Sequence, residues 1–256
     1  MLNNDRIIYK RNQLVEVICQ VNYPSILSIE TTEPSEFQTL IRTSYPKYQF
    51  GNEYEDEIAI NLKNNNIESK VQRHTISKLH CFISQDDSCR VVVAKNRISY
   101  SMKKYDNWEK FYDNFWKVFK EFNEIYQPNY FNRIGIRYIN LINKKRLQLD
   151  AKWEELLKPQ ILGFNNSNEE DYEIVNTTVK SEILYNGMNA RITSSYVLEN
   201  ETNEKCYLID CDYYKVSDCT IDRIDDNLKK LHDNFQGFFD DLITEKMRNS
   251  LNCEGG

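Results

Sequence analysis

Hydrophobic and polar positions follow a strand pattern through most of the first hundred residues. The β-branched run that begins at Leu14 ends at Pro24, as a strand bounded by a turn does. After Pro34, Phe37 and Ile41 recur at helical spacing with Leu40, which predicts a short helix that Pro46 ends. Strands are predicted at residues 14–23, 53–62, 69–74, 75–84, 89–95 and 97–104. These strands follow one another too closely for crossover helices, so we expect an antiparallel meander.

A helical pattern replaces the strand pattern after Asp106, which is a candidate N-cap. Large apolar residues then recur every three or four positions as far as Pro128, which predicts one long amphipathic helix packed against a sheet. The members of this stripe are Trp108, Phe111, Tyr112, Phe115, Phe119, Phe122 and Ile125.

The second half of the chain repeats this order of elements. A strand is predicted at 130–142, a short helix at 152–161, and three strands at 172–184, 188–198 and 205–214. Asn186-Gly187 is a hairpin signal between the first two of these three strands. A long C-terminal helix, capped by Asp218 or Thr220, follows the stripe Ile221, Ile224, Leu228, Leu231, Phe235, Phe238, Leu242 and Met247.

The repeated order indicates an internal duplication, with pseudo-repeats at about 9–128 and 129–250. We expect an α+β fold in which a curved antiparallel sheet has two long helices on one face and the other face open. This arrangement resembles the TATA-binding-protein fold and the helix-grip folds in element order alone, so it implies no function. Because the segment 126–130 is too short for a flexible linker, residues 1–256 are expected to form a single domain.

Composition narrows the class of protein further. The 256 residues carry 33 Lys and Arg against 39 Asp and Glu, a net charge of −6. Without a signal-peptide core or an apolar run of about 18 residues, we expect a cytoplasmic protein that does not enter the membrane. The seven cysteines form no C-x-x-C motif, so they are interpreted as buried apolar residues and not as a disulfide or zinc framework.

Four segments resemble a known family. The N-terminal segment 9–24 (YKRNQLVEVICQVNYP) is similar to an N-P-L-x-E-V opening followed by a strand that ends in Phe-Pro or Tyr-Pro. Residues 131–140 (FNRIGIRYIN) are similar to an R-I-G-L-R-Y-x-N strand, 105–111 to a Tyr-x-x-Trp-x-x-Phe helix start, and 231–244 to a C-terminal helix. Together they resemble a sporadically distributed family of uncharacterised prokaryotic proteins, from which the chain departs at Gln13, where the family usually has Pro. The resemblance implies no catalytic residue, and the family's patchy distribution implies a gene of mobile elements or defence clusters.

The predicted strand 130–142 holds the main candidate ligand site. Alternation places Phe131, Arg133, Gly135 and Arg137 on one face and Tyr138 on the other. Two arginines beside a glycine suit a phosphate, a carboxylate or a stacked base, and Phe131 or Tyr138 would supply the stacking ring. Lys95, Arg97 and Lys103 on a neighbouring strand are expected to extend the basic face. The alternative is that these arginines pair with some of the acidic residues and serve structure.

Other candidate sites are weaker. Asp210 and Asp212 at a strand end point to the same side and are metal candidates for Mg²⁺, although strand-end solvation is the competing interpretation. The acidic run 53–57 is interpreted as a solvated strand edge, and a turn is expected between His74 and His80. The motifs H-E-x-x-H, G-x-S-x-G, G-x-x-x-x-G-K and G-x-G-x-x-G are absent from the sequence, so no cofactor is expected.

Two functions remain open. The first is a non-enzymatic binding component that recognises a protein partner encoded by a neighbouring gene, as in a mobile element or an antiviral defence cluster. The second is a nucleic-acid-binding or nucleic-acid-processing protein that uses the face of Arg133 and Arg137. The acidic net charge counts against the second, because binding to phosphate backbones requires a basic surface.

Overall fold

A computed structural model of the protein describes residues 8–63, 66–166, 173–251 and 253–254. It is a mixed α+β fold in which the main strands have the order β3-β4-β5-β6-β2-β7-β10-β9-β8. By its internal contacts the chain divides into two compact units. Unit 1 comprises residues 1–19, 103–105 and 133–256, and unit 2 comprises residues 20–102 and 106–132. Strand β2 (Leu14–Asn22) contributes residues to both units.

Unit 2 is built on the predicted meander. Its strands β3 (Lys47–Lys63), β4 (Asn66–Ile83), β5 (Cys89–Ala94) and β6 (Arg97–Met102) pair antiparallel in sequence order. Two short helices precede them, α1 (Leu27–Thr31) and α2 (Ser35–Ile41). The long helix α3 (Trp108–Tyr126) follows, and Asn107, one residue after the expected Asp106, is its N-cap.

The aromatic stripe of α3 forms the core of unit 2. Phe115 and Phe122 are 1% and 0% exposed, and Phe122 lies against the rings of Tyr23 and Phe37. Tilted and edge-to-face ring contacts of this kind add to the free energy gained by burying the rings. The prediction that the stripe packs into a core is therefore confirmed.

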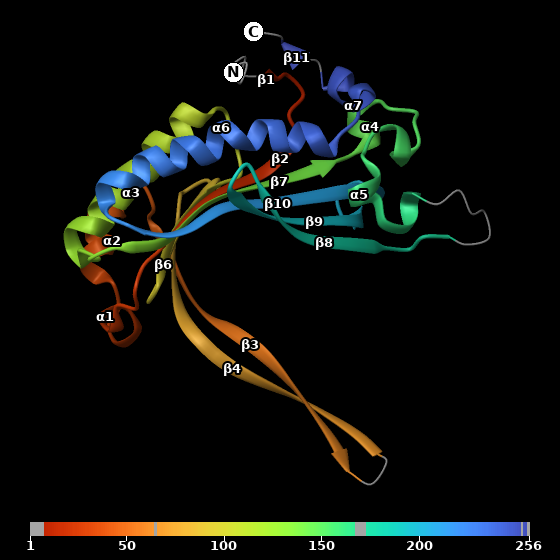
Figure 1. Ribbon diagram of the computed structural model, residues 1–256. Helices are drawn as coiled ribbons and strands as arrows, with labels where there is room; N and C mark the ends of the chain where they lie inside the picture. Colours follow the sequence, from red (N-terminus) through yellow and green to blue (C-terminus); the bar gives the residue numbers. More distant parts are fainter. Residues whose placement is uncertain (1–7, 64–65, 167–172, 252, 255–256) are drawn as a thin grey trace. The chain divides into compact units, whose positions relative to one another are not determined.

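Unit 1 contains the strands β7 (Phe131–Ile142) from residue 133 on, β10 (Glu204–Cys219), β9 (Met188–Glu199) and β8 (Thr177–Tyr185), in that order. The long helix α6 (Ile224–Leu242) lies across one face of these strands, and among the described residues of unit 1 no helix lies on the other face (Figure 1). We call that uncovered side the open face. Burial along β10 alternates as expected for a strand with one covered face and one open face. Ile209, Cys211 and Tyr213 are fully buried, while the residues between them are not.

Short elements complete unit 1. They are α4 (Lys144–Leu147), the 3₁₀ helices η1 (Trp153–Glu155), η2 (Gly163–Asn166) and η3 (Ile221–Arg223), α5 (Pro159–Leu162), α7 (Glu245–Ser250) and the strands β1 (Ile8–Tyr9) and β11 (Cys253–Glu254). Strand β1 pairs antiparallel with β11, and the Tyr9 hydroxyl donates to Asp240 of α6. Neither of these contacts follows from local sequence patterns, because they join residues more than two hundred positions apart.

Four sequence predictions are corrected by the structure. Residues 69–84 are not divided, because one continuous strand, β4, includes both His74 and His80 and no turn separates them. Instead a bulge between Glu53 and Tyr54 shifts the register of the β3–β4 pair. The expected helix 152–161 is broken into η1 and α5, because Pro159 cannot continue a helix that began before it.

The C-terminal helix also differs from the prediction. Helix α6 ends at Leu242, and Met247 lies in the separate helix α7, which Thr244 caps. Thr220 precedes η3 without a side-chain cap bond, and Asp218 is still part of β10. Residue 172, the first of a predicted strand, lies outside the described residues.

Two further features bear on chemistry. Cys19, Cys206 and Cys211 are buried, and burial raises the pKa of Cys206 to about 11, which keeps this thiol protonated at neutral pH. Within the described part of the chain, none of the helices has the length and apolar character needed to cross a membrane.

Candidate functional site

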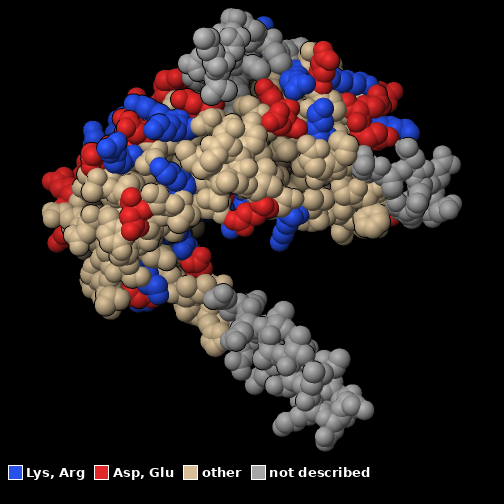
Figure 2. Space-filling model, in the orientation of Figure 1, with Lys and Arg blue, Asp and Glu red and all other residues tan. Residues whose placement is uncertain are grey.

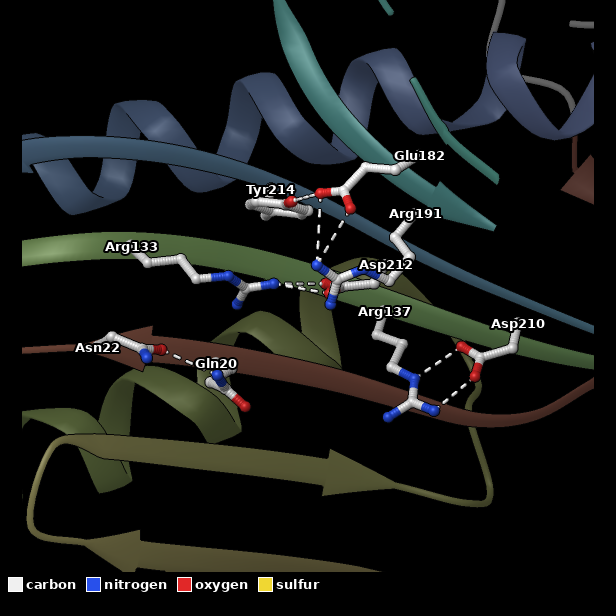
Figure 3. A network of polar contacts seen from close by, with 9 residues as sticks. All are labelled: Gln20, Asn22, Arg133, Arg137, Glu182, Arg191, Asp210, Asp212 and Tyr214. Atoms are coloured by element: carbon white, nitrogen blue, oxygen red, sulfur yellow. Dashed lines mark hydrogen bonds and ion pairs between the residues drawn. The ribbon is translucent and has the colours of Figure 1, made fainter. Parts of the chain in front are cut away.

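Both arginines of the predicted site lie on the open face of unit 1, and each is paired with a carboxylate of β10 (Figure 3). Arg133 donates to both oxygens of Asp212, with Nη2 at 2.9 and 2.7 Å from them. Arg137 donates through Nε to Oδ1 of Asp210 at 2.6 Å and through Nη2 to Oδ2 at 2.5 Å. The sequence reasoning thus identified four residues that the fold brings together as two ion pairs.

Arg133 is the more confined of the two cations. Its guanidinium carbon lies 4.3 Å from the ring centre of Tyr214, a cation–π contact, and its side chain is 19% exposed. Gly135 makes this position possible, because a Cβ there would lie 2.9 Å from Nη1 of Arg133 and 3.0 Å from Cβ of Tyr214. The glycine therefore makes room for the side chain of Arg133.

Arg137 is more accessible. Its side chain keeps 45% exposure, while that of its partner Asp210 keeps 16%. The hydrogen bond to Asp210 is the main reason that the pKa of Arg137 is raised, and Asp212 and Glu16 add to the effect. A ligand anion would have to displace Asp210 before it reached both donor groups of Arg137.

Two residues that the sequence reasoning did not name extend the Arg133 pair toward the edge of the sheet. Arg191 of β9 is 3.3 Å from Oε1 of Glu182 on β8, and Glu182 also accepts a hydrogen bond from the Tyr214 hydroxyl. That bond and the nearby arginines lower the pKa of Glu182, so its carboxylate is ionised at neutral pH. In the strand register Glu182 lies opposite Arg191, and Arg191 lies opposite Asp212.

Charges therefore alternate in one row across four strands. In strand order the row is Arg133, Asp212, Arg191 and Glu182, and we call it the charge ladder (Figure 3). The hairpin turn could have revealed its outer half. Asn186 and Gly187 have φ of 48° and 77°, as the two central residues of a tight hairpin turn do. Such a two-residue loop pairs Tyr185 with Met188. Three pairs further from the turn, Glu182 lies opposite Arg191.

The charge ladder is self-neutralised, which limits its chemistry. Two arginines face two carboxylates within it, and the adjacent Arg137–Asp210 pair is balanced as well. Among the described residues, Asp210 and Asp212 belong to no group of three potential metal ligands. Acidic and basic side chains are also interspersed on the surface visible in Figure 2, without one large basic patch.

The other predicted ligand residues lie elsewhere. Phe131 is 0% exposed and packs against Phe119 of α3, and both residues belong to unit 2. Tyr138 is 3% exposed, stacks on Phe235 of α6 at 3.9 Å between ring centres, and bonds through its hydroxyl to Nδ1 of His232. Neither ring is available to stack on a base, because each one is part of a core. Among the neighbouring cations, Lys95 donates to the carbonyl of Ile76, and Lys103 is exposed.

Arg97 belongs to a second feature, in unit 2. Strands β3 and β4 form a two-stranded ribbon of residues 47–63 and 66–83, and β5 pairs with β4 only from His80 to Ile83 (Figure 1). Arg97 donates to Glu53 of the ribbon at 2.8 Å and its side chain is 17% exposed. Its observed contact thus anchors the ribbon. Of the acidic run 53–57, only the side chain of Glu53 lies among the described ones.

Further contacts fix the base of the ribbon. His80 is 2% exposed, and its Nε2 is 3.1 Å from the carbonyl oxygen of Ile29, while its Nδ1 is 3.0 Å from the Tyr48 hydroxyl. Burial lowers the pKa of His80, so the ring is neutral at pH 7 and can donate to one partner and accept from the other. The carboxylate of Glu30 accepts from the backbone of Lys78 at 3.2 Å.

Large aromatic side chains are exposed on the described part of the ribbon. Phe50 is 55% exposed, Tyr54 is 52% exposed and Tyr48 is 37% exposed. Such rings on a structure that is fixed at its base are typical of contacts between proteins, where aromatic residues are enriched. We call Tyr48, Phe50 and Tyr54 the ribbon aromatics.

No family model, curated protein or solved structure matches the chain.

Proposed function

We propose that the protein is a non-enzymatic binding component that recognises a protein partner, with the ribbon as its main contact. The observation that carries this proposal is the exposure of the ribbon aromatics on a ribbon whose base is fixed by Arg97, His80 and Glu30. A two-stranded ribbon is only marginally stable by itself in water. A partner that covers the rings and adds hydrogen bonds would stabilise it.

The charges of the ribbon favour a protein over a nucleic acid. Residues 47–83 contain five Lys and Arg and five Asp and Glu, so the ribbon offers no excess of positive charge to a phosphate backbone. On the open face of unit 1, Arg133 and Arg137 are already occupied by Asp212 and Asp210. Binding of nucleic acid there would require these two ion pairs to open.

The remaining parts of the proposal rest on the sequence. We infer a cytoplasmic protein whose partner is encoded by a neighbouring gene of a mobile element or a defence cluster, as the family resemblance implies. The duplication is also part of the proposal, because in each half one strand, short helices, a set of strands and a long helix follow in order. The first half has four strands after its short helices and the second has three, so the two copies would have diverged. The placement of both long helices on one face stays a prediction.

The test is co-expression of the tagged protein with each flanking gene product, followed by co-purification and titration calorimetry of any pair. Phe50→Ala combined with Tyr54→Ala is expected to weaken binding about a hundredfold, since central aromatic residues contribute about 2 kcal/mol or more at interfaces. Leu27→Ala is the matched control, because Leu27 is apolar, belongs to unit 2, lies outside the ribbon and is 71% exposed.

Two results would overturn the proposal. One is a bound protein whose affinity is the same for the ribbon variant and the control. The other is co-purified nucleic acid, recognised by a high ratio of absorbance at 260 nm to that at 280 nm, that is lost at high salt and in Arg137→Ala.

A further inference from the structure

Strand β8 (Thr177–Tyr185) is an edge of the sheet of unit 1. It pairs with β9 along its whole length, from Thr177 opposite Tyr196 to Tyr185 opposite Met188. Among the residues that the structure describes, no strand pairs with its other side. The outward backbone groups of such a strand can pair with a strand of another molecule.

The side chains of this edge are more apolar than an exposed edge usually allows. Leu184 is 73% exposed and Ile183 is 41% exposed. Proteins that remain monomeric protect such edges with prolines, bulges or charges that resist pairing. The segment 177–185 contains no proline, its register with β9 is regular, and its charged residues are Lys180 and Glu182.

These two charges lie where the charge ladder ends. The row Arg133, Asp212, Arg191 and Glu182 finishes on a negative charge at the edge (Figure 3). Lys180 is two residues before Glu182, on the same face of the strand, and is exposed without an ion pair to any described residue. One copy of the chain thus presents two charges on the same face of one edge: the carboxylate of Glu182, which ends the charge ladder, and the ammonium group of Lys180, which has no ion partner among the described residues.

We propose that two copies of this chain associate through their β8 strands, paired antiparallel about a twofold axis at Ser181. In this register Lys180 of each copy lies opposite Glu182 of the other, and Val179 lies opposite Ile183 of the other. Lys180 of the second copy continues the alternation of the charge ladder beyond Glu182. All nine residues of β8 find a partner, because Thr177 then lies opposite Tyr185 of the second copy.

The charges select this register over its neighbours. A twofold axis perpendicular to the sheet sets residues of the same face opposite each other. One residue of β8 must therefore lie opposite its own copy, with the axis between the two. An axis at residue 180 would set Lys180 against its own copy, and an axis at residue 182 would do the same for Glu182. Like charges directly opposite each other are destabilising, so Lys180 and Glu182 disfavour slipped pairings and favour the one at Ser181.

This inference is independent of the proposed function, since it concerns contacts between copies of one chain in unit 1. The ribbon and its aromatic residues belong to unit 2 and take no part in it.

The first test is a charge exchange followed by sedimentation velocity over a wide range of protein concentration. Lys180→Glu places a second carboxylate opposite Glu182 at two places in each dimer and is expected to weaken dimerisation about tenfold or more. Glu182→Lys sets like charges opposite in the same way. A mixture of the two variants restores both opposite-charge pairs, so heterodimers are expected to form where neither variant dimerises alone.

The second test uses a cysteine at the axis. Ser181→Cys brings two cysteines directly opposite each other, with Cα atoms about 4.5–5.5 Å apart, within the range for a disulfide. Mild oxidation is expected to give a covalent dimer in high yield. Thr178→Cys is the matched control on the same strand, since its copies would be six residues out of register, about 20 Å apart.

Several outcomes would overturn the proposal. A wild-type chain that stays monomeric at all concentrations would do so. Dimers that are unaffected by Lys180→Glu, or equal cross-linking of Ser181→Cys and Thr178→Cys, would place the interface elsewhere, for example at the ribbon. If a charge variant fails to fold, as judged by circular dichroism, the comparison of the two cysteine variants decides.

Discussion

The two arginine pairs of the open face differ in how far they are withdrawn from water, and this difference predicts how much each stabilises the protein. Arg133 and Asp212 have side chains that are 19% and 20% exposed, and the tyrosine ring beneath Arg133 excludes water from one side. Arg137 is 45% exposed beside Asp210. Because water and salt screen exposed charges more strongly, the coupling free energy should be larger for the first pair.

The magnitudes follow from these exposures. Removing one partner of a fully buried pair costs about 3–5 kcal/mol, and an exposed pair contributes about 0.2–1 kcal/mol. The Arg133–Asp212 pair lies between these limits, so we expect Arg133→Gln to lower the free energy of unfolding by about 2 kcal/mol. Its coupling with Asp212→Asn should be about 1–2 kcal/mol, against about 0.5 kcal/mol between Arg137→Gln and Asp210→Asn.

The measurement is a double-mutant cycle for each pair, from urea unfolding followed by circular dichroism and tryptophan fluorescence. Both cycles are repeated at about 0.5 M salt, where the Arg137 coupling should fall by a larger fraction than the Arg133 coupling. Equal couplings for the two pairs would refute the reasoning. So would a coupling near zero between Arg133 and Asp212, which would leave that arginine available to a ligand.

Three further predictions test the fold. Phe115→Ala and Phe235→Ala should each lower the free energy of unfolding by about 3–5 kcal/mol, because these rings are 1% and 8% exposed. If urea unfolding shows a decrease in this free energy of less than about 1 kcal/mol, the rings do not belong to the cores. Burial lowers the pKa of His80 from its usual 6.5, so stability should be full above that pH and decline below it, as the unfolded chain takes up the proton first. In His80→Gln the melting temperature should depend less on pH. An unchanged slope would show that protonation of His80 does not cause the pH dependence. Gly187→Ala should lower the free energy of unfolding, measured in urea, by about 1 kcal/mol, because Gly187 has φ of 77°. Gly51→Ala, at a position without positive φ, is the control and should not lower it.

Local patterns in the sequence were sufficient to predict most of the helices and strands. The helix stripe from Trp108 to Phe122 is confirmed as a core, because a repeat of three and four residues leaves few alternatives to an amphipathic helix. The division of residues 69–84 into two strands was wrong, since the polar residues around His74 resemble a turn when the partner strand is unknown. The register of a long ribbon is set by its partner, and no local signal reports it.

The candidate site shows the same limit. Alternation along β7 predicted that Arg133 and Arg137 share a face, and both do lie on the open face. It could not predict which carboxylates would face them, because Asp210 and Asp212 are more than seventy residues away. The burial of Phe131 was missed as well, since strand periodicity gives no information on where the helix α3 lies.

The division of β2 between the two units has a consequence for synthesis on the ribosome. Residues 20–132 contain all of unit 2, and only positions 103–105 within this range belong to unit 1, so unit 2 can assemble while the rest of the chain is still being made. Residues 8–19 leave the ribosome first, yet their partners in unit 1 are translated after unit 2. One example is the hydrogen bond that the Leu141 amide donates to the Gln13 carbonyl at 2.9 Å. The first part of β2 therefore obtains its neighbour β7 only after more than a hundred further residues have been translated. At typical elongation rates of about 5–20 residues per second this interval lasts at least several seconds, a period in which nascent-chain chaperones can bind the segment.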